Sequence, residues 1–133
     1  MAHWLIKGEP DSYGWEDLVR DGGTEWDGIR NATAAKNLRA MKVGDELLFY
    51  HSGTAKAAVG VARVAREAQA DGDDGRWVSV RVEPVRPLPA PVTLAAMKAN
   101  PALAEMATIR QSRLSVSPVT AAEWATVLGL ATA

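Results

Sequence analysis

Apolar residues recur with the two-residue period of β-strands over much of this chain. Five segments show this period, or form short apolar runs rich in branched and aromatic side chains: residues 2–7, 46–51, 57–68, 77–83 and 114–118. Within 57–68 the period breaks, because Val59 and Val61 fall on one face and Val64 falls on the other. Either both faces of this strand are buried, or a bulge at Gly60 shifts its register.

Helical segments are expected between and after these strands. Their candidate ranges are residues 12–19, 32–41, 93–99, 101–107 and a last helix that begins at residue 120. Asp11 or Ser12 is suited to cap the first helix and Asn100 to cap the fourth, and residues 120–123 form a capping box. The helices are short, so they are expected to decorate the strands rather than form a bundle.

Four prolines between residues 84 and 91 predict an extended crossing that cannot sit inside a sheet, because proline donates no ladder hydrogen bond. Strands and helices do not alternate as they do in a doubly wound sheet. The chain is therefore expected to form a single α+β domain over residues 1–133. Its predicted fold is a small mixed β-barrel of five or six strands decorated by short helices.

Composition narrows the class of protein. The chain has 133 residues, of which 47% are hydrophobic and 23% charged, as in ordinary soluble domains. There is no cysteine, and His3 and His51 are the two histidines, so we expect neither a metal site nor a cofactor. No apolar run reaches the roughly 20 residues of a membrane span, so no membrane partner is expected. The first residues enter a strand without a secretion signal, which favours the cytoplasm.

The charge is unevenly distributed, although the formal net charge is −1. Residues 28–44 and 106–122 contain no acid. Five of the six basic side chains in these two segments are candidate phosphate contacts: Arg30, Lys36, Arg39, Arg110 and Arg113. Charge alone favours ordinary solvated helix faces equally well.

Residues 25–31 combine a tryptophan, acids, a glycine, an arginine and an amide in a segment without periodicity. The indole of Trp26 is suited to stack on a base, Asp27 to accept from a base amino group, and Asn31 to contact a base edge. The alternative is a buried tryptophan with Asp27 capping the next helix. The other four tryptophans lie in periodic segments, where core packing is expected.

Catalytic motifs are scarce. The sequence contains no phosphate-binding glycine loop, no Gly-x-Ser-x-Gly and no His-Glu-x-x-His. His51 and Ser52 are adjacent in a predicted strand and so point to opposite faces, which argues against a catalytic pair. Lys7 and Glu9, two residues apart, form either a surface ion pair or part of a ligand site at the end of the first strand.

Four segments in this order resemble the motifs of the EVE domain, a family of the PUA-like superfamily that also includes the YTH and ASCH domains. They are residues 4–11, 26–31, 43–52 and 113–119. The resemblance implies a PUA-like β-barrel with a pocket for a modified base, either a modified cytosine in DNA or a modified base in RNA. It also implies the residues of that pocket: Lys7, Glu9, Trp26, Asp27, Arg30, Asn31, Phe49, Tyr50, His51, Ser52 and Ser115, with Arg110 and Arg113 closing it.

This chain departs from the family pattern at two positions. The family commonly has serine at Gly8 and an aromatic residue at Ala32, so the ligand of other members is not carried over. Our leading hypothesis is a non-enzymatic module that binds DNA or RNA carrying a modified base. One alternative is a modified-nucleoside hydrolase resembling ASCH-type enzymes, in which Lys7 and Glu9 act together. The other is a protein-interaction domain with a vestigial pocket.

Overall fold

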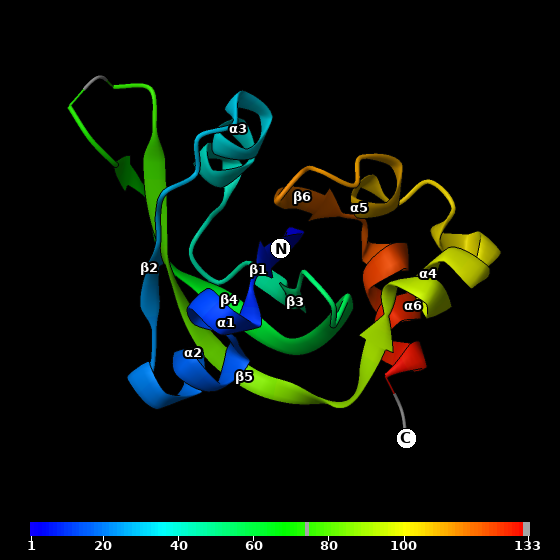
Figure 1. Cartoon of the computed structure of the whole chain (residues 1–133). Coiled ribbons are helices and arrows are strands. Elements are labelled where there is room, and N and C mark those ends of the chain that lie inside the picture. The colour runs from blue at the N-terminus through cyan, green and yellow to red at the C-terminus, as the bar shows by residue number, and fades with distance from the viewer. Residues whose placement is uncertain (74, 132–133) are drawn as a thin grey trace.

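The computed structural model describes residues 1–73 and 75–131, whose strands form one curved sheet (Figure 1). The six strands are β1 (His3–Gly8), β2 (Thr24–Trp26), β3 (Glu46–His51), β4 (Ala57–Ala70), β5 (Val78–Thr93) and β6 (Val116–Val119). Their order is β2-β5-β4-β3-β1-β6, with β1 parallel to β3 and the other neighbours antiparallel. The expected mixed α+β fold is confirmed.

The sheet is barrel-like without being closed, because β2 and β6 are its two edges. Helix α3 (Ala32–Ala40) contacts β4, β5 and β6, so it lies across the opening between the β4–β5 hairpin and the far edge (Figure 1). Its N-terminus follows directly from the segment after β2, which places that segment beside the opening.

Both faces of the sheet carry a hydrophobic core. In β1, Trp4 and Ile6 belong to one cluster and Leu5 to the other; in β3, Phe49 belongs to the first and Tyr50 to the second. Side chains from α2 (Trp15–Asp21) and α3 cover the first cluster, and those of α4 (Leu94–Ala99) and α6 (Ala121–Leu130) cover the second. Burial on both faces explains why residues 2–7 and 46–51 are nearly continuous apolar runs.

Both alternatives for the break in this strand hold, since both faces of β4 are buried and a bulge lies next to Gly60. The β3–β4 register shifts between Phe49 and Tyr50, and the β4–β5 register shifts between Ala58 and Gly60. A side chain at Gly60 would lie 2.6 Å from the ring of Trp15, so the indole rests directly on this stretch of backbone. The break in the period of β4 therefore reflects a bulge that seats Trp15.

The prolines lie inside a strand, contrary to the prediction of a crossing outside the sheet. Strand β5 continues to Thr93, with Pro84 opposite Ala62 and Pro87 opposite Gly60 of β4. Strand β2 pairs only with residues 80–82 of β5, so the proline-rich part of β5 pairs with β4 on one side and with no strand on the other. Proline is tolerated at such an edge, because a position that donates no hydrogen bond to the neighbouring strand does not need the missing N–H.

The helices follow the predictions with two differences. A separate turn, α1 (Pro10–Tyr13), precedes α2, and Gly14 begins α2 by donating to Asp17 at 2.7 Å, so neither Asp11 nor Ser12 caps it. Residues 101–107 form only a 3₁₀ turn, η1 (Pro101–Leu103), before α5 (Ala107–Arg110). The cap at Asn100 and the capping box at the start of α6 are confirmed. None of the described helices is long and apolar enough to cross a membrane.

Asp45 ties the start of β1 to the turn before β3. Its buried carboxylate accepts hydrogen bonds from the backbone N–H groups of Ala2 and Lys42 and from the indole of Trp4, at 3.0–3.2 Å. Burial alone would raise the pKa of Asp45, but these hydrogen bonds outweigh it and lower the pKa below 3.8. Asp45 is therefore ionised at neutral pH and fixes the register of the two parallel strands.

Candidate nucleic-acid interface

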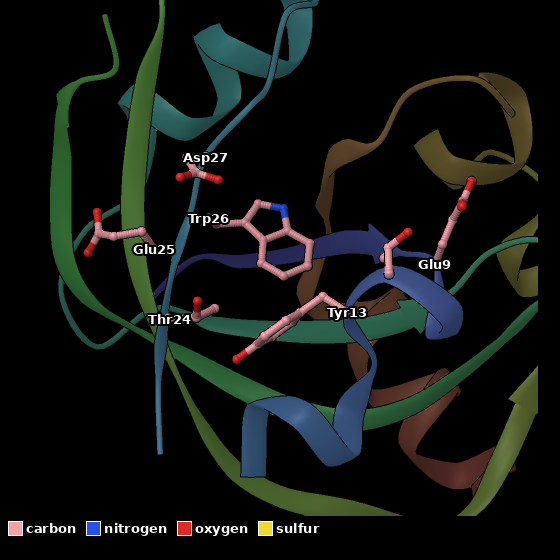
Figure 2. Close-up of a pocket in the computed structure, with 8 residues that line it drawn as sticks. Glu9, Tyr13, Thr24, Glu25, Trp26 and Asp27 are labelled. Carbon is pink, nitrogen blue, oxygen red and sulfur yellow. The ribbon is translucent and has the colours of Figure 1, made fainter. Parts of the chain in front are cut away.

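A cavity of about 290 Å³ lies where the chain leaves β1 and passes β2 (Figure 2). We call it the Trp26 cavity; its lining residues are Gly8, Glu9, Ser12, Tyr13, Thr24, Glu25, Trp26 and Asp27. The end of β1 and the short α1 form one wall, and β2 forms the other. Residues 8–13 and 24–27 meet here although they are separated in the sequence by α2.

Trp26 forms the aromatic wall of this cavity. Its ring meets Tyr13 edge to face at 6.5 Å and Phe49 at 5.5 Å, and the residue keeps 9% of its surface exposed. No residue that the structure describes accepts a hydrogen bond from the indole N–H, which therefore stays available to a ligand. Trp26 is thus both packed into the core and open to the cavity.

Gly8 allows this close packing. A Cβ built on Gly8 would lie 3.0 Å from the carbonyl oxygen of Tyr13 and 3.1 Å from Cη2 of Trp26. A serine here, as the family commonly has, would require these neighbours to move by a few tenths of an ångström. The departure from the family pattern is therefore matched by a tight arrangement of Tyr13 and Trp26 in this chain.

The cavity is rich in hydrogen-bond acceptors. Asp27 and Glu9 are exposed carboxylates, and Figure 2 shows the indole between Asp27 and Tyr13. The hydroxyl of Tyr13 donates to Asp21 at 2.8 Å, and burial together with this bond raises its pKa. None of the described lining residues is lysine or arginine, so the cavity suits a ligand that donates hydrogen bonds rather than a phosphate.

Glu25 is turned away from the indole, as Figure 2 shows. Both of its carboxylate oxygens accept from Arg66 at 2.8 Å, and one also accepts from Ser79 at 3.0 Å. The hydrogen bond from Arg66 is the main reason that the pKa of Glu25 is lowered. Glu25 therefore anchors β2, and with it Trp26, to the β4–β5 hairpin.

The predicted wall of Phe49, Tyr50, His51 and Ser52 does not face one cavity. Phe49 is fully buried behind Trp26, and its ring contacts that of His51 at 5.8 Å. Tyr50 and Ser52 line a different cavity, of about 330 Å³, together with Lys7. The reason is the pleat of β3, which sends successive side chains to opposite faces.

His51 lies apart from the Trp26 cavity. Its Nε2 atom accepts from the backbone N–H of Trp15 at 3.0 Å, and it lines a separate cavity of about 520 Å³ with residues of α2. Burial lowers the pKa of His51, which keeps the ring neutral and able to accept this bond. Its position supports the start of α2 rather than a base.

Arg30 and Asn31 make structural contacts. Arg30 pairs with Asp71 at 2.9 Å and lies over the ring of Trp77 at 5.6 Å. The Oδ1 atom of Asn31 accepts from the N–H of Ala34 at 2.9 Å, so Asn31 caps α3. Of the alternative given for this segment, the cap by Asp27 is therefore wrong, whereas the buried tryptophan is confirmed. Core packing was predicted for Trp77, and this prediction is wrong, because Trp77 is partly exposed under Arg30. The other three tryptophans in periodic segments are buried as predicted.

The remaining predicted cations lie outside the Trp26 cavity. Arg110 and Arg113 line a polar cavity of about 360 Å³ that Asn31 also borders. Lys36 is exposed on α3, and Arg39 donates to the carbonyl of Arg76. Within the described chain, neither Lys36 nor Arg113 pairs with an acid, whereas Arg110 approaches Glu105 at 3.7 Å.

Ser115 borders none of these cavities. Its carbonyl accepts from the N–H of Lys7 at 3.0 Å and so continues the pairing of β1 with the segment before β6. The structure therefore brings together Glu9, Trp26 and Asp27 and separates them from the other predicted pocket residues. Sequence reasoning missed Ser12, Tyr13 and Thr24, for which no local pattern signals a cavity.

Comparisons with known proteins agree with this architecture. The EVE domain profile matches residues 2–130. Thymocyte nuclear protein 1 of Homo sapiens is 32% identical over an alignment of 165 positions, which covers 97% of this chain and 73% of that protein. The crystal structure of a protein from Agrobacterium tumefaciens is 39% identical, with a TM-score of 0.96, and covers 98% of this chain and 93% of that one.

A further solved structure is that of the human THYN1 protein in complex with 5-methylcytosine containing DNA. It is 31% identical to this chain, with a TM-score of 0.92, and the match covers 98% of each chain. The profile match over nearly all residues and these likenesses confirm the resemblance found in the four motifs. The chain belongs to the EVE domain family.

Proposed function

We propose that this protein is a non-enzymatic module that binds nucleic acid by taking one modified base into the Trp26 cavity. The observation that carries the proposal is an aromatic wall with a free indole N–H beside an exposed carboxylate, in a cavity without described cations. The human THYN1 protein, which shares the fold over its length, is bound to DNA containing 5-methylcytosine. A modified cytosine in DNA is therefore the first ligand to test, followed by modified bases in RNA.

The roles of the cavity residues follow from their chemistry. Asp27 would accept from the exocyclic amino group of a base, and the N–H of Trp26 would donate to a ring nitrogen or carbonyl. The exposed part of the aromatic wall would contact the face or the edge of the base. Taking a base out of the nucleic-acid stack costs a few kcal/mol, and stacking the base on an aromatic side chain contributes about 1–3 kcal/mol. Hydrogen bonds at the edge of the base are thus needed to make binding favourable.

The sugar–phosphate backbone would be held by cations outside the Trp26 cavity. Lys36 and Arg113 are exposed and make no ion pair with a described acid, so both are available to phosphates. Such contacts carry no base information and contribute a salt-dependent affinity. Arg30 is a weaker candidate because Asp71 already pairs with it.

The alternative of a nucleoside hydrolase requires Lys7 and Glu9 to act together. Lys7 lines the cavity that contains Tyr50, whereas Glu9 lines the Trp26 cavity. The ammonium group of Lys7 donates to the carbonyl of Ser112 at 2.8 Å. Their separation favours the binding module over the hydrolase.

The test measures the anisotropy of labelled oligonucleotides that differ in one base, cytosine or 5-methylcytosine, in single- and double-stranded DNA and in RNA. We expect tighter binding of a modified oligonucleotide. Because cytosine and 5-methylcytosine both carry the amino group that Asp27 would accept from, Asp27→Asn should weaken the binding of both oligonucleotides by about 10- to 150-fold, the equivalent of roughly 1.5–3 kcal/mol for a hydrogen bond to a charged group. Asp73→Asn is the matched control, since Asp73 is an exposed acid outside the cavity.

Two further variants separate base recognition from backbone contact. Trp26→Phe keeps an aromatic ring but removes the indole N–H, so it should weaken the binding of oligonucleotides through the base and leave the salt dependence unchanged. Arg113→Gln should weaken all oligonucleotides similarly and flatten the salt dependence. Equal affinity of the wild-type protein for modified and plain bases, in both DNA and RNA, would refute the proposal.

A further inference from the structure

The cavity that contains Lys7 has a distinct chemistry, and we call it the Lys7 cavity. Three lysines from separate parts of the chain line it: Lys7 on β1, Lys56 in the turn before β4, and Lys98 on α4. None of its described lining residues is aspartate or glutamate. The cavity of about 330 Å³ therefore concentrates positive charge that no carboxylate in its lining neutralises.

Thr108 supplies a second, independent observation. It lines the same cavity, only 2% of its surface is exposed, and its hydroxyl has no hydrogen-bond partner among the described residues. A buried hydroxyl without a partner is unfavourable, and native proteins rarely retain one. Less than 1 Å² of this oxygen is exposed, so a small movement of α5 would let a ligand oxygen in the cavity satisfy it.

Lys7 and Tyr50 are hydrogen-bond donors in the lining of the cavity. The Nζ atom of Lys7 donates to the carbonyl of Ser112 at 2.8 Å and lies 5.5 Å from the ring centre of Tyr50. Burial lowers the pKa of Lys7, and an anion nearby would oppose this shift by favouring the charged form. Burial raises the pKa of Tyr50, so its phenol stays a neutral donor, and none of the described residues accepts from it.

We infer that the Lys7 cavity binds a phosphate group. Its donors come from β1, β3, the turn before β4, α4 and α5, and thus from several directions, which suits a tetrahedral anion. Its charges are lysine ammonium groups rather than the planar guanidinium that pairs with a carboxylate in two-point fashion. Either a phosphodiester of a nucleic acid or a free phosphate or phosphomonoester would supply the same chemistry.

This site is separate from the Trp26 cavity. Tyr50 belongs to the hydrophobic cluster on one face of the sheet, and Trp26 belongs to the cluster on the other. Phosphate binding can therefore be measured without any nucleic acid, and its outcome does not depend on whether the protein prefers a modified base.

The experiment follows thermal unfolding and calorimetric binding with inorganic phosphate, using sodium chloride at matched ionic strength as the reference. Phosphate should raise the midpoint of unfolding in a saturable manner, as expected for a ligand of the folded state. Lys98→Gln should abolish most of this rise. Lys42→Gln is the matched control, because Lys42 is an exposed lysine outside the cavity.

Thr108→Val separates a ligand contact from a structural role. Valine has nearly the same shape, and it removes a hydroxyl that lacks a partner among the described residues, so the protein without phosphate should be as stable as the wild type or more stable. The phosphate-dependent rise in the midpoint should nevertheless shrink. A merely structural threonine would leave that rise unchanged.

A plain oligonucleotide distinguishes the two sources of phosphate. If it competes with inorganic phosphate, and Lys98→Gln weakens both, the site holds a phosphodiester. If phosphate binds without competition, the site serves a free phosphate or phosphomonoester. No saturable phosphate effect beyond that of chloride, or an equal effect in the wild type, Lys98→Gln and Thr108→Val, would overturn the inference.

Discussion

Substituting Gly60 by alanine should destabilise the fold and disturb the aromatic row behind the Trp26 cavity. The new Cβ would lie 2.6 Å from three carbon atoms of the Trp15 ring, whereas carbon atoms in ordinary contact are about 3.5–4.0 Å apart. The ring would have to move by about 1 Å by this comparison. It cannot do so freely, since Trp15 is buried and its ring meets Phe49 at 5.7 Å.

The magnitude follows from this confinement. Overpacking a core costs about 1–3 kcal/mol, and the rigid ring places Gly60→Ala towards the upper end of that range. For a chain of this length the midpoint of thermal unfolding should fall by about 6–12 °C. Because Phe49 in turn contacts Trp26, the affinity for a modified oligonucleotide should fall as well.

The assay is urea unfolding at neutral pH, followed by far-ultraviolet circular dichroism, with Gly129→Ala as the matched control. Gly129 lies in α6, and an added Cβ would meet nothing within 4 Å. Gly129→Ala should therefore stabilise the protein by about 0.5–1 kcal/mol, because alanine restricts the unfolded chain and favours a helix. A free energy of unfolding for Gly60→Ala within about 0.5 kcal/mol of the wild type would refute the close seating of Trp15.

Two other predictions concern stability and pH. Asp45→Asn should lower the free energy of unfolding at pH 7 by about 1–3 kcal/mol, because at least one of three donors loses its acceptor. The pKa of Asp45 is lowered in the folded state, so its contribution is complete well above the ordinary carboxyl pKa and is lost as the pH falls through the folded-state pKa. Unfolding measured from pH 7 to acid should show this loss in the wild type and not in Asp45→Asn; parallel curves would contradict it. Asn31→Ala should cost about 1 kcal/mol through the cap of α3, whereas Asn31→Asp should retain the cap; equal losses in urea unfolding would show that the cap is not the cause.

Part of the site could be predicted from the sequence, and part could not. Trp26 and Asp27 stood out because a large aromatic beside an acid has no place in a periodic core segment, and the structure places both at one cavity with Glu9. Tyr13 could not be found in this way. It lies in a four-residue helical turn without periodicity, and it reaches Trp26 only because α1 folds back beside β2.

The sequence predicts in part that the side chains of β3 face different cavities. Alternation alone implies that Phe49 and Tyr50 point to opposite faces, so one wall could not include both. The sequence does not predict which face of β3 lies towards the Trp26 cavity, because both faces are apolar and the pattern does not distinguish them. The packing of α2 and α3 on one side and of α4 and α6 on the other settles it.

The sequence by itself indicated the local elements of this protein: the strands with their periods, the caps at Asn100 and residues 120–123, and the family motifs, with a bulge at Gly60 as one of two explanations for the break in β4. These depend on neighbours a few residues apart, whose conformational preferences are readable locally. The tertiary structure decided which polar groups meet. Arg30 pairs with Asp71, and Glu25 with Arg66, each across 41 residues. Such pairs depend on strand register and helix packing, which no local pattern specifies. The tertiary structure also covers both faces of β3, so the expected pocket becomes separate cavities on the two faces of the sheet.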